Sequence, residues 1–200
     1  VKLIVLDAGQ DPARALQDAK QLVEQDHVMA LVGEFTLADA AFAKYVDSKG
    51  IPVVGGVAQE ATFLTDPNFF PSGTQLVVQT VGTIALSHAA KKKHIGVMYC
   101  AESPICASLI PLAQGAAALS GVAVTAQKVS STAPSYTAPC LALKGAGADA
   151  LFPAVASPTV LRIVAACAQQ GFKPAVLSQT STTTNAWLKD PNLNGALLSG

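Results

Sequence analysis

The chain has 200 residues, of which 50% are hydrophobic and 13% are charged, with 13 basic residues balancing 13 acidic ones. This composition excludes a disordered chain, and the neutral balance argues against a nucleic-acid-binding protein, which needs concentrated positive charge. The length is enough for one large α/β domain or two small ones.

The most informative segment runs from Asp7 to Gly56 and reads DAGQDPARALQDAKQLVEQDHVMALVGEFTLADAAFAKYVDSKGIPVVGG. Three short apolar runs, KLIVL before Asp7 and then VMALVG and IPVVGG, alternate with two stretches of helical periodicity. Such runs are typical of buried parallel strands, and the stretches between them are typical of amphipathic crossover helices.

The same alternation continues to the end of the chain. Helices are predicted at Ala13–Asp26, Leu37–Lys49, Gln75–Lys92, Ile105–Ser120, Tyr136–Gly145 and Pro158–Gln170. Strands are predicted at Leu3–Asp7, Val28–Gly33, Val53–Gly55, Ile95–Cys100, Val122–Val129, Ala150–Val155, Ala175–Gln179 and Ala196–Ser199. One-sided helices around nearly continuous apolar strands predict parallel sheets that are covered on both faces.

The alternation of strands and helices is interrupted between Ala58 and Gly73, where no clear helix is predicted. Phe69-Phe70 is interpreted as a short strand before a Pro/Gly-rich segment that crosses to a second lobe. We therefore expect a first lobe at residues 1–72 and a second lobe at residues 73–200. The apolar stretch from Leu76 to Ala90 is interrupted by polar residues and is shorter than the ~20 residues that a membrane-spanning helix needs. It is interpreted as a buried helix.

In order and spacing, the segment from Asp7 to Gly56 resembles the type I periplasmic binding proteins, the branched-chain amino acid receptor group in particular. The resemblance implies an α/β fold of two Rossmann-like lobes, each with a parallel sheet flanked by helices. Family members have chain before and after the part that matches, so the first lobe is expected to be incomplete. The chain lacks an initiator Met and opens inside a predicted strand, so we expect a processed or cut sequence.

No catalytic or cofactor motif is present. The sequence holds no G-x-S-x-G, P-loop or G-x-G-x-x-G pattern, and no cysteine or histidine spacing typical of a zinc site. We therefore expect a non-enzymatic protein without a cofactor or metal. The Lys91-Lys92-Lys93-His94 run is interpreted as the solvated end of a helix.

Ligands of parallel α/β folds bind outside the carboxyl ends of the strands, near free N–H groups of helix N-termini. That rule selects loop residues from both lobes as the predicted site. They are Glu34, Phe35, Thr36, Ala58 and Gln59 in the first lobe, and Glu102, Ser103, Ile105, Ser157, Gln179 and Thr180 in the second. For each residue singly, helix capping or a solvated loop is an equally good interpretation, and Ser157-Pro158 is a good N-cap pair.

In the amino acid receptors, a serine-rich turn and a Gly-Ala-Thr segment hold the ligand carboxylate, while tyrosines and an acidic residue hold its ammonium. This chain keeps Gly33 and Ala58, but Ile105 stands at the first tyrosine position and Ser157 near the second. Gln179 or Thr180 occupies the acidic place. Without that carboxylate an ammonium is costly to bury, so a neutral or carboxylated ligand is favoured unless Glu34 or Glu102 supplies the charge.

The four cysteines allow three pairings. A Cys100–Cys106 bridge would close a short loop, and Cys140 and Cys167 lie on helices that flank one strand, where a bridge requires a stagger of the helices. Four buried free thiols are the alternative. Because the resemblance implies an exported protein, disulfides are favoured.

The sequence therefore predicts an extracellular, periplasmic or envelope-anchored receptor that captures an amino acid or a related carboxylate or amide between two lobes. Its implied partner is the membrane permease of an ABC importer, with no nucleic-acid partner. The alternatives are the effector-binding domain of a LacI-like transcription regulator or sensor and, third, a flavodoxin-like or dehydrogenase enzyme. Disulfides would argue against the regulator.

Overall fold

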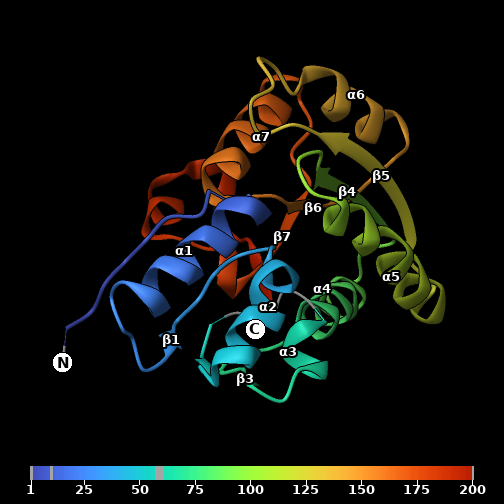
Figure 1. Ribbon diagram of the computed structural model, residues 1–200. Helices are drawn as coiled ribbons and strands as arrows, with labels where there is room; N and C mark the ends of the chain where they lie inside the picture. The colour runs from blue at the N-terminus through green and yellow to red at the C-terminus, as the bar shows by residue number, and fades with distance from the viewer. Residues whose placement is uncertain (1, 10, 57–60, 200) are drawn as a thin grey trace. The chain divides into compact units, whose positions relative to one another are not determined.

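A computed structural model describes residues 2–9, 11–56 and 61–199 (Figure 1). The chain divides into two compact units, Val1–Leu76 and Val77–Gly200, each of which is described by itself. This division lies a few residues after the predicted lobe boundary. In the described part of the chain, every helix is too short or too polar to traverse a lipid bilayer.

The first unit is a three-stranded parallel sheet with helices on one face. Its strands, in the spatial order β1-β2-β3, are β1 (Leu31–Val32), β2 (Val53–Val54) and β3 (Phe69–Phe70). Its helices are α1 (Pro12–Glu24), α2 (Asp39–Lys49) and the one-turn α3 (Thr62–Thr65).

Local sequence explains where these helices begin and end. The Asp11 carboxylate caps α1 by accepting a hydrogen bond from the Arg14 N–H, and Pro12 follows at the first helical position. Helix α2 ends at Gly50, which has a positive φ of 64° and terminates the helix in the left-handed conformation.

The core of the first unit lies on one face of its sheet. Phe42 and Val46 of α2 pack with Val53 and Phe69, and the rings of Phe42 and Phe69 are stacked with centroids 6.0 Å apart. Residues of opposite parity point away from this core, because side chains alternate along a strand. Val32, Val54 and Phe70 therefore form an exposed row across the three strands, with 56%, 42% and 50% of their surface exposed.

Two strand predictions in this unit need correction. Leu3–Asp7 has no strand assignment, and Leu3 and Val5 are exposed. A strand exists only through its ladder with a neighbour, and the described residues pair β1 with β2 alone. The predicted strand at Val28–Gly33 is reduced to Leu31–Val32, because only these two residues pair with a neighbouring strand in the described part of the chain.

The second unit is a five-stranded parallel sheet with helices on both faces. Its strands, in the order β5-β4-β6-β7-β8, are β4 (His94–Cys100), β5 (Ala123–Val129), β6 (Ala150–Ala154), β7 (Ala175–Gln179) and β8 (Leu197–Ser199). Its α-helices are α4 (Leu76–Ala89), α5 (Pro104–Ser120), α6 (Thr137–Gly145) and α7 (Ser157–Gln169). Short 3-10 helices η1 (Thr180–Thr182), η2 (Asn185–Lys189) and η3 (Pro191–Leu193) connect β7 to β8.

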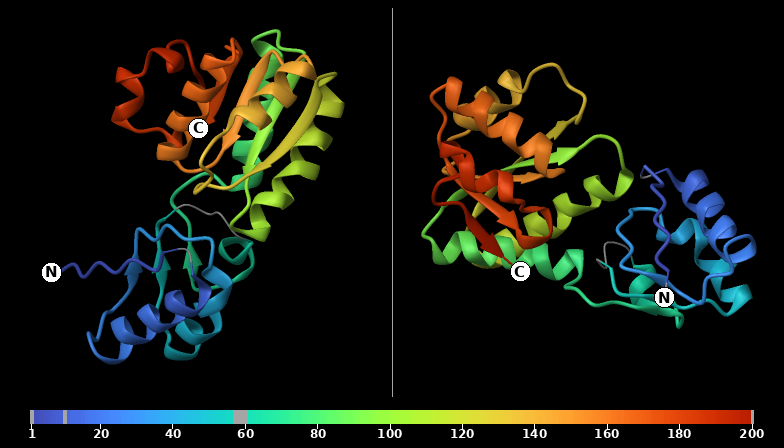
Figure 2. Two further views of the ribbon diagram at one scale, coloured as in Figure 1. Left: turned by 90° about the horizontal axis from the view of Figure 1, so that it is seen from above. Right: turned by 90° about the vertical axis from the view of Figure 1, so that its left-hand side faces the viewer.

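Two hydrophobic cores cover the two faces of this sheet. On one face, Ile84 of α4 and Ala113 of α5 pack against Val97 and Leu177. On the other face, Cys140 and Leu143 of α6 and Val160, Ile163 and Cys167 of α7 are buried. Figure 2 shows α5, in yellow-green, and α7, in orange, on opposite faces of the sheet.

The strand order places a topological switch beside β4. From β4 the chain passes through α5 to β5 on one side, and then through α6 to β6 on the other side. The two crossover helices cover opposite faces of the sheet, and in open α/β sheets ligands typically bind outside the carboxyl ends of the strands at such a switch, here β4 and β6. The fold therefore points to the loops after these strands as the binding edge of the unit.

Most of the predicted elements of this unit are present, with shifted ends. Helix α4 stops at Ala89, and the lysine run closes it as predicted, because Lys91 has a positive φ of 58° and the N–H groups of Lys91 and Lys92 donate to the carbonyl oxygens of His88 and Ser87. Ser157 is the first residue of α7, and the N-cap position belongs to Ala156, so the prediction of a Ser157 N-cap is wrong. The Ser157 hydroxyl has other partners, described below.

Candidate ligand-binding site

The carboxyl ends of β4, β6 and β7 form one edge of the sheet, because these strands are parallel neighbours. This edge, called the strand-top edge below, brings together all the predicted site residues of the second unit. They are Glu102, Ser103 and Ile105 after β4, Ser157 after β6, and Gln179 and Thr180 at the end of β7.

Glu102 is held in place by the loop that follows β5. Its Oε1 accepts hydrogen bonds from the Ser130 hydroxyl at 2.8 Å, the Ser131 N–H at 2.6 Å and the Ser131 hydroxyl at 2.9 Å. Burial alone would raise the pKa of Glu102, but the hydrogen bonds from Ser130 and Ser131 outweigh it and lower the pKa to about 2. Glu102 is therefore an ionised group that already has partners within its own unit.

The same loop is pinned from the other side by residues that the sequence analysis did not single out. The Tyr136 hydroxyl donates to the carbonyl oxygen of Ser130 at 2.8 Å, and Arg162 of α7 donates to the carbonyl oxygens of Ser131 and Ala133. The Arg162 guanidinium also lies 5.1 Å from the centroid of the Tyr136 ring. No local pattern reveals this, because an arginine on a helix surface gives no sign of its partner.

A disulfide closes the loop after β4. Cys100 ends β4 and is bonded to Cys106 in the first turn of α5, with Cα atoms 5.5 Å apart. The bridge spans the segment that holds Glu102, Ser103 and Ile105, so it restricts the conformations of that loop. Ser103 occupies the N-cap position of α5 without a side-chain cap hydrogen bond, and Ile105 is half-buried.

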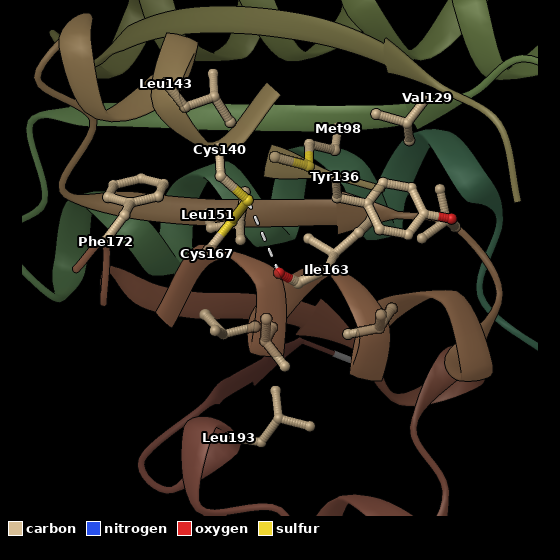
Figure 3. Close-up of a cluster of buried hydrophobic side chains, with 14 of the residues drawn as sticks. Met98, Val129, Tyr136, Cys140, Leu143, Leu151, Ile163, Cys167, Phe172 and Leu193 are labelled. Carbon is tan, nitrogen blue, oxygen red and sulfur yellow. Dashed lines mark hydrogen bonds between the residues drawn. A yellow bond between two sulfur atoms is a disulfide. The ribbon is translucent and has the colours of Figure 1, made fainter. Parts of the chain in front are cut away.

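The second disulfide lies in the core. Cys140 of α6 is bonded to Cys167 of α7 with Cα atoms 5.0 Å apart, so the helices have the stagger that this pairing requires. Figure 3 shows the bridge among the buried side chains, with Cys140 also near the carbonyl oxygen of Ile163. All four cysteines are therefore paired.

The Ser157 hydroxyl joins the start of α7 to the helix η2. It accepts a hydrogen bond from the indole N–H of Trp187 at 2.8 Å and lies 3.0 Å from the Thr184 hydroxyl. Trp187 is buried, and its N–H needs an acceptor. Ser157 therefore has a structural role in addition to its place on the strand-top edge.

Gln179 differs from its neighbours, because it is buried and its side chain has an unused donor. Only 5% of its surface is exposed, and its Nε2 has no hydrogen-bond partner among the residues that the structure describes. It follows Leu177 by two positions, so it lies on the face of the sheet covered by α4. Thr180, the next residue, is exposed.

Hydroxyl and amide groups surround this position. Gln179 pairs in register with Ser199 of β8, whose hydroxyl lies 2.8 Å from that of Thr83 on α4. One turn earlier on α4, the amide oxygen of Gln79 accepts a hydrogen bond from Ser181 at 3.0 Å. Gln179 thus lies in a polar setting where the other groups named here are paired.

In the first unit, Glu34, Phe35 and Thr36 follow β1. Both carboxylate oxygens of Glu34 are buried, Phe35 is 58% exposed, and the Thr36 hydroxyl accepts a hydrogen bond from the Ala38 N–H at 3.1 Å. Gly56, after β2, has a φ of 84°, and a Cβ there would collide with the carbonyl oxygen of Glu34. Ala58 and Gln59, also predicted for the site, lie outside the described residues.

Two shallow surface grooves of the second unit lie away from this edge. One, of about 370 Å³, is lined by residues of α7, β7 and η3, and the other, of about 530 Å³, by residues of the connection from β7 to β8. None of the predicted site residues lines either groove. Across residues 2–9, 11–56 and 61–199, histidines, cysteines and acidic residues form no group of three able to hold a metal ion.

Comparison with protein families gives a match to the periplasmic binding protein family over residues 1–199. The chain belongs to the periplasmic binding protein family. No match was found among curated protein sequences.

Solved structures of this fold agree with the assignment. A leucine-binding protein LivK from Thermotoga maritima superposes with a TM-score of 0.80 at 17% identity, covering 90% of this chain and 53% of that one. A solute-binding protein of an ABC transporter from R. palustris, in complex with benzoate, gives 0.83 at 12% identity, covering 96% and 54%. Another, in complex with 4-hydroxybenzoate, gives 0.77 at 18% identity, covering 88% and 49%.

The likeness establishes the two-lobe type I fold, and this chain spans about half the length of the solved structures that it matches. The first lobe is accordingly incomplete relative to those structures, as predicted.

Proposed function

We propose that this chain is the ligand-capturing part of an exported, non-enzymatic solute receptor that serves an ABC importer, and that it binds a small organic acid or amide. The observation that carries the ligand class is the buried Nε2–H donor of Gln179 at the strand-top edge, which has no hydrogen-bond partner within residues 2–9, 11–56 and 61–199. Leaving a buried donor unpaired costs about 1–3 kcal/mol, so an acceptor supplied by a ligand is a physical reason for its presence.

The charge at the strand-top edge supports an acid or an amide over an amino acid. The second unit contains three acidic residues, Glu102, Asp149 and Asp190. Glu102 is the one at this edge, and its Oε1 is already held by Ser130 and Ser131. Within this unit an ammonium group at this edge would therefore have to share Glu102 with Ser130 and Ser131, and burying it without a counter-charge is costly. Donors such as Gln179 suit carboxylate and carbonyl oxygens instead.

Export is supported by the two disulfides. Bridges persist in oxidising compartments and are rare in the cytosol, so four paired cysteines favour a periplasmic or extracellular receptor over a cytosolic LacI-like regulator. Structural relatives include an extracellular ligand-binding receptor and solute-binding proteins of ABC transporters, which agrees with this location and partner.

Matched ligands test the proposal. Thermal unfolding and calorimetric titration of the purified protein should compare leucine with 4-methylpentanoate, which lacks only the amino group, and with the corresponding amide. Benzoate and benzamide form a second pair. A ligand at one hundred times its Kd adds about 2.7 kcal/mol to the free energy of unfolding, which is readily measured.

We expect the acids or amides to stabilise the protein and leucine to do so at least tenfold less effectively. Tighter binding of leucine would overturn the proposed ligand class while leaving the receptor function intact. No response to a broad panel of acids, amides, amino acids and sugars would contradict the receptor function itself.

A further inference from the structure

The two units differ sharply in charge. Residues 1–76 hold five basic and ten acidic residues, a net charge of −5, whereas residues 77–200 hold eight basic and three acidic residues, a net charge of +5. The neutral total therefore conceals a strongly basic second unit.

Five of these eight basic residues lie at one edge of the second unit. Lys91, Lys92 and Lys93 immediately precede β4, and Lys173 comes two residues before β7. Because the strands are parallel, their starting ends lie at the same edge of the sheet, opposite the strand-top edge. Lys144 of α6 reaches this edge too, since its Nζ donates to the carbonyl oxygen of Gln170 just after α7. These five residues are called the lysine edge below.

The lysine edge is exposed, and its charge is largely uncompensated. Four of the five side chains are exposed, and Lys92 is half-buried. In the described part of the second unit, no lysine lies within ion-pair distance of a carboxylate. The carboxylate at this edge, Asp149, accepts hydrogen bonds from the N–H groups of Lys93 at 3.0 Å and His94 at 2.9 Å, and its charge also interacts with that of Lys92, so it offsets part of the positive charge.

The spacing lets the charges act together. The starts of β4 and β7 are separated by β6, so they are about 10 Å apart at ~4.8 Å per strand. That distance is close to the Debye length of ~8 Å at physiological salt. The electrostatic attractions of the lysines for a charged partner at this edge therefore add together.

An apolar side chain accompanies the lysines. Leu119, on the last turn of α5, is 92% exposed. Helix α5 runs from the end of β4 to the start of β5, so its last turn lies at the strand-start edge as well. An exposed leucine at the same edge as several lysines suits the boundary between lipid headgroups and acyl chains.

We propose that the lysine edge, with Leu119, is a peripheral docking surface for an anionic phospholipid membrane. The residue type supports a lipid surface over a specific protein partner, because lysine is a flexible point charge, whereas arginine provides the rigid fork that recognises single carboxylates. The surface lies at the opposite end of the sheet from the strand-top edge, so docking would leave the strand tops of this unit uncovered. The inference does not depend on the ligand proposed above.

Vesicle co-sedimentation of the full chain tests the inference. Vesicles of phosphatidylcholine with one quarter phosphatidylglycerol are compared with phosphatidylcholine alone, at 50 mM and 500 mM NaCl. We expect binding to the anionic vesicles at low salt, release at high salt and little binding to neutral vesicles. Each lysine near an anionic surface contributes about fivefold in affinity, so Lys91→Gln/Lys93→Gln/Lys173→Gln should weaken binding ~100-fold.

The control removes the same charge elsewhere. Lys44, Lys128 and Lys189 are exposed and lie outside the lysine edge, and their triple substitution by glutamine should change the affinity less than fivefold. Leu119→Ser should weaken binding without changing its salt dependence.

Equal losses in the two triple variants would overturn the proposal in favour of an effect of net charge. Equal binding to neutral vesicles would overturn it as well. Binding to polyglutamate without binding to anionic vesicles would replace it with an acidic protein partner.

Discussion

Glu102 accepts two hydrogen bonds from Ser131, one from its backbone N–H at 2.6 Å and one from its hydroxyl at 2.9 Å. A carboxylate predicted to face a ligand is thus also the anchor of the loop that follows β5. This relationship changes what the residue is expected to do when the pH falls.

The first prediction concerns acid stability. The pKa of Glu102 is lowered to about 2 in the folded state, whereas its ordinary value is 4.5. A carboxyl group whose pKa is depressed on folding stabilises the protein fully above its unfolded pKa and loses that contribution as the pH falls toward the folded pKa. Between pH 4.5 and about 2 the wild type should therefore lose stability more steeply than Glu102→Gln. Urea unfolding at a series of pH values measures both slopes, and parallel curves would contradict the role of Glu102.

The second prediction separates binding from stability at Gln179. Methionine has a similar length and no donor, so Gln179→Met removes a buried N–H that has no partner in the described part of the protein. Its loss should leave the melting temperature unchanged or raise it, because an unsatisfied donor destabilises the fold. Affinity for an acidic ligand should fall about 10- to 100-fold, the value of one hydrogen bond to a charged acceptor.

Gln169→Met is the matched control for that variant, because Gln169 is exposed at the far end of α7. It should alter neither quantity. A fall in melting temperature that accounts for the whole loss of binding in Gln179→Met would identify Gln179 as a structural residue.

The third prediction compares two glycines that both have positive φ. At Gly56 a Cβ would collide with the carbonyl oxygen of Glu34, whereas at Gly50 a Cβ would meet nothing within 4 Å. Gly50→Ala should therefore cost only the left-handed backbone strain, about 1–2 kcal/mol. Gly56→Ala should cost at least ~2 kcal/mol more, because the backbone of the loop after β1 must move. Urea unfolding followed by circular dichroism gives the loss in free energy of unfolding for both variants. Equal losses would show that the loop after β1 can move without an energetic cost.

The fourth prediction ranks the disulfides. Cys140 and Cys167 are 27 residues apart and Cys100 and Cys106 are six apart. Loop-closure entropy therefore assigns about 3.5 kcal/mol to the first bridge and ~2–2.5 kcal/mol to the second. Fluorescence of Trp187, the single tryptophan, should report a larger loss of stability for the Cys140→Ala/Cys167→Ala pair than for Cys100→Ala/Cys106→Ala. The reverse order would show that strain or residual structure outweighs loop length.

Much of the fold could be predicted from local sequence. The helix predicted at Pro158–Gln170 is present as α7, shifted by one residue at each end, and the predicted strand Ala175–Gln179 has the same bounds in the structure. The predictions that failed concern elements whose structure depends on contacts with other segments of the chain. Leu3–Asp7 has the composition of a strand, yet it forms none. A strand requires hydrogen bonds to a neighbouring strand, which the composition of the segment itself does not provide.

The location of the candidate site could be predicted from the sequence, but the hydrogen bonds of its side chains could not. Sequence order indicated which loops follow parallel strands, and the strand order confirms that the loops after β4, β6 and β7 share one edge. It gave no indication that the Ser157 hydroxyl would accept from Trp187, 30 residues away. Nor did it distinguish Gln179, whose amide nitrogen has no hydrogen-bond partner among the described residues, from Gln79, whose amide oxygen accepts from Ser181.

The division between the two levels has a physical cause. Helix and strand periodicity depends on residues a few positions apart, so the sequence alone determined a parallel α/β chain with its functional loops at the strand ends. Hydrogen bonds of polar side chains join positions as distant as Ser181 and Gln79, which are 102 residues apart. Only the tertiary structure could therefore decide which polar groups are already paired and which remain for a ligand.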